Sequence, residues 1–362
     1  MKEFLTRTEC TAMRGIAILA IMLHNYCHFV KGIAKENEYQ FLNLRCDRLW
    51  EALTNLNEFL PMDLLSFFGH YGVPVFLFLS GYGLVKKYEK EIYSHPSPLT
   101  SHLLFLRYHY LKLLRMLIVG FVLFIMVDAV TPGRFPFHWD NVIAQLLMYI
   151  NVLPEPDKII WPGIYWFFGL IMQLYIVYRL LLYRRSSWYV IVLIAVCWLL
   201  QMFCDPDGNT LNRLRYNFIG GMLPFGLGVL LARSTKSVSD HISHLSPLTF
   251  HLVFLLSVAL VFAMSFNFHS WLWIPVVIII GTIAMVKVMP ETVMKVFIFF
   301  GTYSAAMFVA HPIARKLFIT VAWQRDAYDG LMLYFVAVIG LSWAVKQIID
   351  RIPSPKEVQS EK

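Results

Sequence analysis

Residues 13–28 read MRGIAILAIMLHNYCH, an apolar helical segment that begins with an arginine and contains two histidines. His24 lies ten residues beyond Arg14, or roughly 15 Å farther along a helix axis. Because the hydrocarbon core of a bilayer is about 30 Å thick, this spacing predicts His24 near the middle of the membrane. An ionisable side chain at that depth costs about 2.5 kcal/mol or more unless it faces a cavity or a partner. His24 is therefore either a functional residue or a neutral histidine that hydrogen-bonds to a neighbouring helix.

The composition of the 362 residues is that of a membrane protein. Hydrophobic residues make up 58% of the chain and charged residues 15%. Soluble domains average about 45–50% apolar residues and about 25% charged residues. A net charge of +8 would fit nucleic-acid binding in a soluble protein. Here the basic residues fall in alternate loops, so we interpret them as signals of membrane orientation and expect no nucleic-acid partner.

Apolar segments long enough to cross a bilayer recur along the whole chain. They predict an all-α, polytopic bundle of about ten transmembrane helices. We expect a single membrane-embedded domain over residues 1–362, with a short tail from about residue 351. Residues 49–60 are predicted to form an amphipathic helix in the interface, and residues 142–153 an interfacial or re-entrant segment. The predicted spans are residues 12–30, 64–86, 110–130, 164–183, 188–203, 216–232, 248–266, 271–288, 296–318 and 331–349.

The distribution of lysine and arginine predicts the orientation. An even number of spans places both termini on one side of the membrane. Basic residues gather in alternate loops, whereas the intervening loops are mixed or acidic. The positive-inside rule therefore predicts cytoplasmic N and C termini. The basic groups are Lys2 with Arg7, residues 86–90, Arg184 with Arg185, Arg233 with Lys236, Lys287 with Lys295, and residues 346–356.

The five cysteines are scattered and form no C-x-x-C pair, so neither a zinc ribbon nor a redox dithiol is predicted. Cys27 and Cys46 could meet on the outer side, and the sequence leaves that open. No metal site and no nucleotide-binding loop are predicted.

A glycine-containing motif opens the second span: residues 72–85 read GVPVFLFLSGYGLV. Gly72 and Pro74 interrupt the start of the helix, and Ser80 and Gly81 lie deep in an aromatic-rich run. Small residues allow helices to pack closely. The motif is therefore interpreted as a packing motif, with a direct chemical role as the alternative.

A third motif lies near the end of the ninth span, where residues 301–313 read GTYSAAMFVAHPI. It contains Tyr303 and Ser304, and His311 precedes Pro312. On the predicted orientation His311 lies towards the outer face. A structural and a catalytic histidine are both compatible with this position.

Taken together, these stretches resemble the bacterial acyltransferase-3 family of integral membrane acyltransferases. Residues 13–28 are similar to the family's opening arginine-to-histidine helix, residues 72–85 to its G-V-P-x-F-F-x-L-S-G-F signature, and residues 301–312 to its closing Y-S…H-P segment. The basic run at Arg107, Lys112 and Arg115 also resembles the family pattern. So do the aromatic stretch from Trp166 to Tyr175 and the glycine helix at residues 220–228. The motifs occur in the family's order over almost the whole chain.

The sequence departs from the family pattern in the first helix. The family commonly has one residue more between the arginine and the histidine than the nine that separate Arg14 from His24. At about 100° per residue, Asn25 takes the angle usual for the histidine, and His24 and His28 flank it. We expect His24 to be the catalytic histidine, with His28 and His311 as the other candidates.

The resemblance implies an enzyme that transfers an acyl group other than an aminoacyl group, usually acetyl. The donor would be a cytoplasmic acyl-CoA, used as a co-substrate without a tightly bound cofactor. The acceptor would be a hydroxyl on a glycan or a lipid-linked molecule, and the location the bacterial inner membrane. Which glycan or lipid-linked molecule is the acceptor is not predicted, and neither is the oligomeric state.

We assign His24 as the base and Arg14 as the donor anchor. A cytoplasmic mouth for the donor phosphates is predicted from Arg14, Lys86, Lys87, Arg107, Lys112 and Arg115. The positive-inside rule alone explains the same cluster equally well. Asn25 and Ser80 are candidate donors to the oxyanion of the tetrahedral intermediate.

Aromatic and polar residues of the outer loops are candidates for sugar binding, although such residues also anchor ordinary proteins at the interface. They are Trp139, Asn141, Trp161 and Tyr165. The rival function is a transporter or flippase, since ten helices and buried histidines also suit one. Against it, no inverted repeat is evident, and Asp128 is the clearest intramembrane acidic residue.

Overall fold

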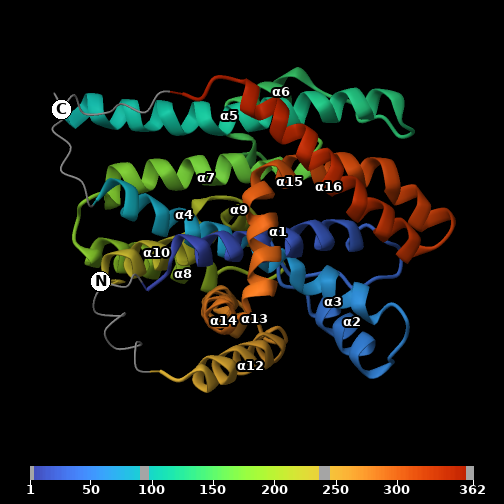
Figure 1. The fold of residues 1–362 in the computed structure, drawn as a ribbon, viewed down its shortest axis with the longest axis horizontal. Helices are drawn as coiled ribbons and strands as arrows, with labels where there is room; N and C mark the ends of the chain where they lie inside the picture. Colours follow the sequence, from blue (N-terminus) through green and yellow to red (C-terminus); the bar gives the residue numbers. More distant parts are fainter. Residues whose placement is uncertain (1–3, 90–97, 236–244, 356–362) are drawn as a thin grey trace.

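The computed structural model describes residues 4–89, 98–235 and 245–355. Within these ranges the regular secondary structure is entirely helical, and no strand occurs (Figure 1). The longer helices lie side by side in a bundle, with shorter helices in the connections. The α-helices are α1 (Arg7–Cys27), α2 (Asn43–Thr54), α3 (Leu60–Phe68), α4 (Gly72–Tyr88), α5 (Pro98–Val130), α6 (Trp139–Leu146), α7 (Trp166–Val177), α8 (Ser187–Met202), α9 (Asn209–Tyr216), α10 (Phe218–Arg233), α12 (Pro247–Met264), α13 (Phe268–Trp271), α14 (Ile274–Val288), α15 (Glu291–Gln324) and α16 (Ala327–Arg351).

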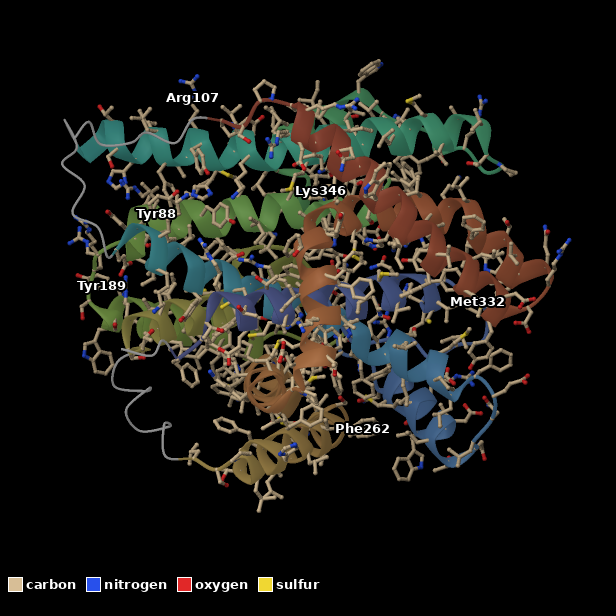
Figure 2. All side chains as sticks on the ribbon, viewed as in Figure 1. Tyr88, Arg107, Tyr189, Phe262, Met332 and Lys346 are labelled. Atoms are coloured by element: carbon tan, nitrogen blue, oxygen red, sulfur yellow. The ribbon has the colours of Figure 1, made fainter. Side chains whose placement is uncertain are left out.

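Seven helical segments within the described ranges are long and apolar enough to cross a membrane, and the bent pair α9–α10 makes an eighth if it counts as one span. Every one of the ten predicted spans corresponds to a helix, but α8 and α14 are shorter apolar helices. Large apolar side chains remain exposed on the outside of the bundle, such as Tyr189 and Met332 (Figure 2). An apolar exterior on an apolar bundle faces lipid. The chain is therefore a multi-pass, all-α membrane protein.

The first helix begins five residues before its predicted start at residue 12. Thr6 caps it: its hydroxyl accepts a hydrogen bond from the Glu9 amide at 3.2 Å, and the Glu9 carboxylate accepts one from the Thr6 amide at 2.8 Å. This capping box stabilises a polar first turn that carries no apolar signal. The helix ends at Cys27, so His24 lies in its last turn, and the depth of His24 in the membrane stays a prediction.

The third predicted span also begins earlier than expected. Helix α5 starts at Pro98 and has 33 residues, so it is roughly 50 Å long. Arg107, predicted in a loop, lies on this helix together with Lys112 and Arg115. Long basic side chains are compatible with a helix end that extends beyond the hydrocarbon core. Lys2, Lys90, Lys236 and Lys356 lie outside the described residues.

The connecting segments contain more helix than the sequence predicted. The amphipathic helix predicted at residues 49–60 is α2, which covers residues 43–54 and ends before Leu60 begins α3. From α3 a 3-10 turn (Gly69–Tyr71) leads into α4, so that one continuous helical segment covers residues 60–88. The apolar stretch at residues 142–153 divides into α6 and a second 3-10 turn, Ile150–Val152.

Glycines allow the central helices to pack so closely that their backbones are in contact. A Cβ atom on Gly301 of α15 would lie 1.9 Å from the carbonyl oxygen of Thr11 on α1, and one on Gly15 would lie 1.9 Å from that of Phe297. A Cβ atom on Gly81 of α4 would lie 2.2 Å from the Phe225 carbonyl oxygen of α10. Helices α1 and α15 therefore pack in direct contact, as do α4 and α10.

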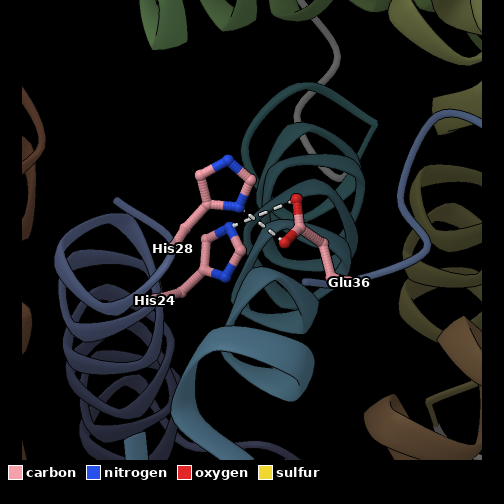
Figure 3. Close-up of side chains that lie close together, drawn as sticks. All are labelled: His24, His28 and Glu36. Carbon is pink, nitrogen blue, oxygen red and sulfur yellow. Dashed lines mark hydrogen bonds and ion pairs between the residues drawn. The ribbon is translucent and has the colours of Figure 1, made fainter. Parts of the chain in front are cut away.

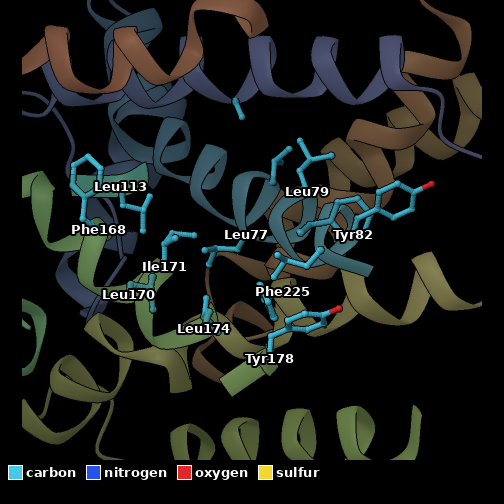
Figure 4. Packing of buried hydrophobic residues seen from close by; sticks show 14 of the residues in the cluster. Leu77, Leu79, Tyr82, Leu113, Phe168, Leu170, Ile171, Leu174, Tyr178 and Phe225 are labelled. Carbon is cyan, nitrogen blue, oxygen red and sulfur yellow. The ribbon is translucent and has the colours of Figure 1, made fainter. Parts of the chain in front are cut away.

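Beside these contacts, leucines of α4 and α7 meet in the core (Figure 4). Leu77, Leu170 and Leu174 are buried, and a Cδ1 atom of each would lie 3.2 Å from a Cβ atom on Gly221. The leucine side chains fill the space that the missing side chain of Gly221 leaves.

Contacts in the structure bear on two questions left open by the sequence. Cys27 and Cys46 are both free thiols. Asp128 is buried, and its carboxylate lies 2.8 Å from the ammonium group of Lys316. The amide of Phe135 also donates a hydrogen bond to Asp128 at 2.9 Å. A transporter would use an intramembrane acidic group such as Asp128 for ion coupling. Here two partners, Lys316 and the Phe135 amide, hold that carboxylate.

Candidate active site

The candidate active site forms where the last turn of α1 meets the turn between α3 and α4. Gly69 makes this approach possible, because a Cβ atom there would lie 2.5 Å from the Ala20 carbonyl oxygen and 2.6 Å from the His24 Cβ atom. The turn therefore lies directly against α1. It brings Ser66 and His70 beside His24, although these residues are distant from it in sequence.

His24 is held in one orientation by a backbone group. Its side chain is buried, with 6% of the residue exposed, and Nδ1 lies 2.6 Å from the Ser66 carbonyl oxygen. A carbonyl oxygen can only accept a hydrogen bond, so Nδ1 carries the proton and donates it. In the neutral ring Nε2 then carries the lone pair. This is the arrangement that a general base or a metal ligand requires.

His28 and Glu36 complete a cluster with His24 (Figure 3). His28 lies one turn beyond His24 on the same side of α1, and its Nδ1 is 2.7 Å from Glu36 Oε2. The other carboxylate oxygen, Oε1, is 4.0 Å from His24 Nε2. Burial alone would raise the pKa of the Glu36 carboxyl, but the neighbouring imidazoles of His24 and His28 hold that pKa well below its usual range. The carboxylate is therefore the charged partner of the two imidazoles.

A cavity of about 290 Å³ opens beside this cluster. Its lining includes His24, His28 and His70 together with aromatic side chains of the α6–α7 connection and α7, and charged groups of both signs. Of the four aromatic and polar residues predicted for sugar binding, only Trp161 lines it. Trp139 is 83% exposed, and the hydroxyl of Tyr165 is buried and donates to the Val309 carbonyl oxygen. The prominent aromatic and charged lining residues are Tyr39, Trp161, Trp166, Glu38, Asp157 and Lys158.

Asn25 lines the cavity, and its side chain is bonded to two neighbouring groups. Its Nδ2 donates to the Ile21 carbonyl oxygen of the preceding turn at 3.3 Å, and its Oδ1 accepts a hydrogen bond from Arg315 Nη1 at 3.0 Å. Arg315 is buried and stacks on Phe29, 3.8 Å from the ring centroid. Asn25 therefore links α1 to α15, and one of its two amide hydrogens is already bonded within α1.

His311 is fully buried and is not among the residues that line the cavity. Its Nδ1 donates to the Met307 carbonyl oxygen, one turn earlier in α15, at 3.0 Å. Tyr303 and Ser304 of the same motif also face the protein, with the Ser304 hydroxyl bonded to the Gly301 carbonyl oxygen at 2.8 Å. Among the three candidate histidines, the cavity brings together His24 and His28 only.

Of the residues singled out on α4 and α7, Trp166 lines the cavity, and the residues on α4 lie at or beyond its edge. A Cβ atom on Gly72 would lie 2.3 Å from the Ala17 carbonyl oxygen, so α4 begins in contact with α1. Pro74 lines a narrow space of about 50 Å³ that shares Tyr39, His70 and Trp166 with the main cavity. Ser80 lies farther along α4, where it interacts with the hydroxyl of Tyr175.

The predicted donor-binding residues do not form one compact group. Arg14 is exposed although it lies two turns into α1, and it interacts electrostatically with Tyr175. Arg115 binds the C-terminal segment. Its Nη1 atom donates to the Ile352 carbonyl oxygen at 3.0 Å and to the Ser354 hydroxyl at 2.7 Å. Arg107 lies on the outer side of α5, away from α1 (Figure 2).

The three remaining lysines of the predicted mouth lie on α4 and α5. Lys86 lies over the Tyr82 ring and Lys87 over the rings of Tyr88 and Tyr108. Lys112 is exposed on α5, and His109 lies within electrostatic range of both Lys87 and Lys112. Lys87 and Lys112 therefore belong to one basic surface, whereas Arg107 and Arg115 lie apart from it.

Sequence reasoning missed Glu36, His70 and Arg315. Glu36 and His70 come from a loop and a turn, where no periodic pattern marks them. The one usable signal was the spacing of His24 and His28, which places two imidazoles on one face of a helix. Arg315 follows the H-P motif by three residues, and nothing in its local sequence marks it as part of the site.

Comparison with known proteins identifies the chain. Residues 9–347 match a protein family described as "Acyltransferase domain". No curated protein and no solved structure matches the chain. The family match covers the candidate active site and almost all of the predicted spans. The chain belongs to the acyltransferase 3 family and is a multi-pass membrane acyltransferase.

Proposed function

We propose that the protein is an O-acyltransferase of the bacterial inner membrane. It would move an acyl group, most simply acetyl, from cytoplasmic acyl-CoA to a hydroxyl of a cell-surface glycan or of a lipid-linked acceptor. The positive-inside pattern supports a cytoplasmic location for the Arg14 end of α1 and an outer location for the His24 end. The donor would then enter from one side and the acceptor from the other.

The observation that carries this proposal is the free Nε2 atom of His24 beside the cavity. The Ser66 carbonyl oxygen fixes the proton on Nδ1, so Nε2 can accept the proton of an acceptor hydroxyl. That hydroxyl oxygen then attacks the carbonyl carbon of the thioester and forms a tetrahedral intermediate. The intermediate collapses, the C–S bond breaks, and the imidazolium returns its proton to the leaving sulfur. The products are an ester and free CoA thiol.

Glu36 suits the charge that develops during this cycle. The imidazolium on His24 would lie 4.0 Å from a Glu36 carboxylate oxygen. A buried opposite charge at this distance stabilises the positive ring and so favours proton abstraction. His28 holds the same carboxylate by a hydrogen bond of 2.7 Å. His28 and Glu36 are positioning residues in this scheme.

Arg14 is the proposed anchor for the donor. It lies on the same helix as His24, about 15 Å away along the axis, and its side chain is exposed although it lies inside a predicted span. A guanidinium group binds phosphate by paired hydrogen bonds. The pantetheine arm of CoA carries the thioester away from the phosphates, which suits a donor held at Arg14 that reacts near His24.

The cavity lining suits a sugar or a similarly polar acceptor. Trp161, Trp166 and Tyr39 offer flat aromatic faces, and Glu38 and Asp157 offer oxygen atoms to hydroxyl groups. Aromatic faces combined with a few converging polar groups are typical of small-molecule sites. The family match supports acyl transfer, and the lining supports the class of acceptor.

The test is transfer of isotope-labelled acetyl from acetyl-CoA to glycan in membranes that carry either the intact protein or the His24→Ala variant. We expect base-labile labelled acetate with the intact protein and a loss of about 10²–10⁴-fold in the variant. The control is His269→Ala, which removes a histidine on α13 outside the cavity lining. Full activity of a correctly inserted His24→Ala variant would contradict the assignment of the base and would favour His28 or His311.

A further inference from the structure

We propose that His24, His28 and Glu36 form a binding site for a divalent transition-metal ion, with Zn²⁺ as the best fit. We further propose that the bound ion prevents His24 from acting as a base. Each of the three residues offers one ligand atom, and these atoms all lie within 4.8 Å of one another. The second part of the inference rests on the proposed role of His24, whereas the first part does not.

The geometry of the three donors suits a small cation. Two histidines one turn apart present their rings on the same side of α1, and Glu36 approaches from the loop that faces them (Figure 3). In a tetrahedral zinc site with bonds of 2.0–2.1 Å, neighbouring ligand atoms are about 3.3 Å apart. The distances of 2.7 Å from His28 Nδ1 to Glu36 and 4.0 Å from His24 Nε2 to Glu36 lie on either side of that value. The first distance is to Oε2 and the second to Oε1, and each differs from that value by less than 1 Å.

The surroundings hold the ligands in place, as they do in metal sites. The Ser66 carbonyl oxygen accepts a hydrogen bond from Nδ1 of His24 at 2.6 Å, which directs Nε2 towards Glu36. Arg45 donates a hydrogen bond to the backbone carbonyl oxygen of Glu36 and so fixes the loop. Hydrogen bonds of this kind orient ligands and set the protonation of their rings.

A further histidine points to a ligand at this place. His70 is 96% buried and lines the same cavity, and its ring centroid lies 5.7 Å from that of His24. Neither of its ring nitrogens makes a hydrogen bond of ordinary geometry to the described residues. Buried polar atoms are normally hydrogen-bonded. A buried imidazole without an ordinary hydrogen bond beside three metal-type donors is explained if the cavity takes a cation or the water bound to it.

The donor set selects the class of metal. Two imidazole nitrogens and one carboxylate oxygen suit zinc and its neighbours, and three protein ligands leave a coordination position open. That position would face the cavity of about 290 Å³. When the ion binds, the proton shared between His28 and Glu36 leaves to solvent, and the lone pair of His24 Nε2 forms the bond to the metal. The same lone pair is then no longer able to take a proton from the acceptor.

Metal binding is tested on the intact, detergent-purified protein after removal of any polyhistidine tag. Calorimetric titration with Zn²⁺ should give one site per chain that is lost in Glu36→Gln and in His28→Ala and retained in His269→Ala. With Co²⁺ as the probe, the wild-type protein should develop the strong visible absorption of a four- or five-coordinate ion. Equal Zn²⁺ binding by all four proteins, or a wild-type Co²⁺ spectrum like that of the hydrated ion, would overturn the site. The Co²⁺ spectrum needs no variant, so it decides even where a variant misfolds.

The consequence for catalysis is tested separately. Acetyl transfer by the wild-type protein should fall as free Zn²⁺ rises through the dissociation constant from calorimetry, and a chelator should restore it. Stimulation by Zn²⁺ or loss of activity with the chelator would overturn the proposed block. An active His24→Ala variant that no longer binds Zn²⁺ would refute the proposed base and leave the metal site standing. An inactive His24→Ala variant with unchanged Zn²⁺ binding would refute the metal site and leave the proposed base standing.

Discussion

The Nδ1 atom of His24 lies 2.6 Å from the backbone carbonyl oxygen of Ser66, which is 42 residues farther along the chain. This hydrogen bond joins the last turn of α1 to the end of α3. It exists because Gly69 lets the chain pass against α1 without a side chain between them. The protonation and direction of the proposed base therefore depend on a glycine that does not itself line the cavity.

The first prediction concerns that glycine. In Gly69→Ala the new methyl group would lie 2.5 Å from the Ala20 carbonyl oxygen and 2.6 Å from the His24 Cβ atom, so α1 and the turn must separate. A displacement of about 1 Å at a catalytic group costs about 100-fold in rate. We expect acetyl transfer to fall by that order while the protein still inserts and folds.

The matched control is Gly83→Ala on α4, where an added Cβ atom would have no neighbour within 4 Å. It should keep wild-type activity. If both alanine variants are equally active, the close approach at Gly69 is not what positions His24.

The second prediction concerns the contact between α1 and α15. In Gly301→Ala a methyl group would lie 1.9 Å from the backbone carbonyl oxygen of Thr11, and backbone cannot rotate away as a side chain can. Overpacking of this kind costs about 1–3 kcal/mol of folding free energy. We expect a lower midpoint of thermal unfolding in detergent.

Gly340→Ala on α16 is the control for this second change. Its added methyl group would meet nothing within 4 Å, and alanine favours a helix over glycine by about 1 kcal/mol. Its unfolding midpoint should therefore equal or exceed that of the wild type. A Gly301→Ala protein as stable as Gly340→Ala would show that the two helices can separate at little cost.

Much of the fold was predictable because helices exposed to lipid appear in the sequence as long runs of apolar residues. All ten predicted spans are helices, since a run of apolar residues in a membrane has few other ways to pair its backbone groups. The errors occur where polar residues extend a helix. The capping box at Thr6 and Glu9 and the basic residues of α5 lie on helices that apolar runs alone do not delimit.

Only those residues of the site that lie on one helix could be predicted from the sequence. His24 and His28 are one turn apart on α1, so their common face follows from helical periodicity. Glu36, Ser66 and His70 reach the same place through a loop and a glycine turn. Contacts of that kind depend on the path of the chain in space, and no local period in the sequence encodes them.

The third prediction is a pH dependence that arises from Glu38 beside the cavity. Burial and the nearby charge of Glu36 raise the pKa of its carboxyl from 4.5 to about 8. The folded protein therefore binds a proton at Glu38 that the unfolded chain has released, and folding stability falls as the pH rises. The contribution is complete below about pH 4.5 and is lost as the pH rises through about 8.

The measurement compares thermal unfolding of wild-type and Glu38→Gln protein on both sides of pH 8, with a chelator present. The glutamine resembles the protonated carboxyl and does not titrate. The unfolding midpoint of the wild type should fall towards alkaline pH relative to that of Glu38→Gln. A difference that stays constant with pH would mean that Glu38 is already charged in the folded protein.

The fourth prediction separates the two explanations of the basic residues. If Arg14 anchors the phosphates of the donor, Arg14→Gln removes charged hydrogen bonds worth about 1.5–3 kcal/mol, and the KM for acetyl-CoA should rise about 10-fold or more. If Arg14 serves only as an orientation signal, the correctly inserted variant should keep its KM.

Lys295→Gln is the control. Within the described chain, the exposed ammonium group of Lys295 forms an ion pair only with Glu291, so this variant should leave the KM unchanged. Initial rates at varied acetyl-CoA and fixed acceptor decide the matter, since loss of a donor anchor raises the KM for the donor, whereas damage to the His24 region lowers kcat. A fall in kcat with an unchanged KM in Arg14→Gln would move Arg14 from the donor site to the chemistry itself.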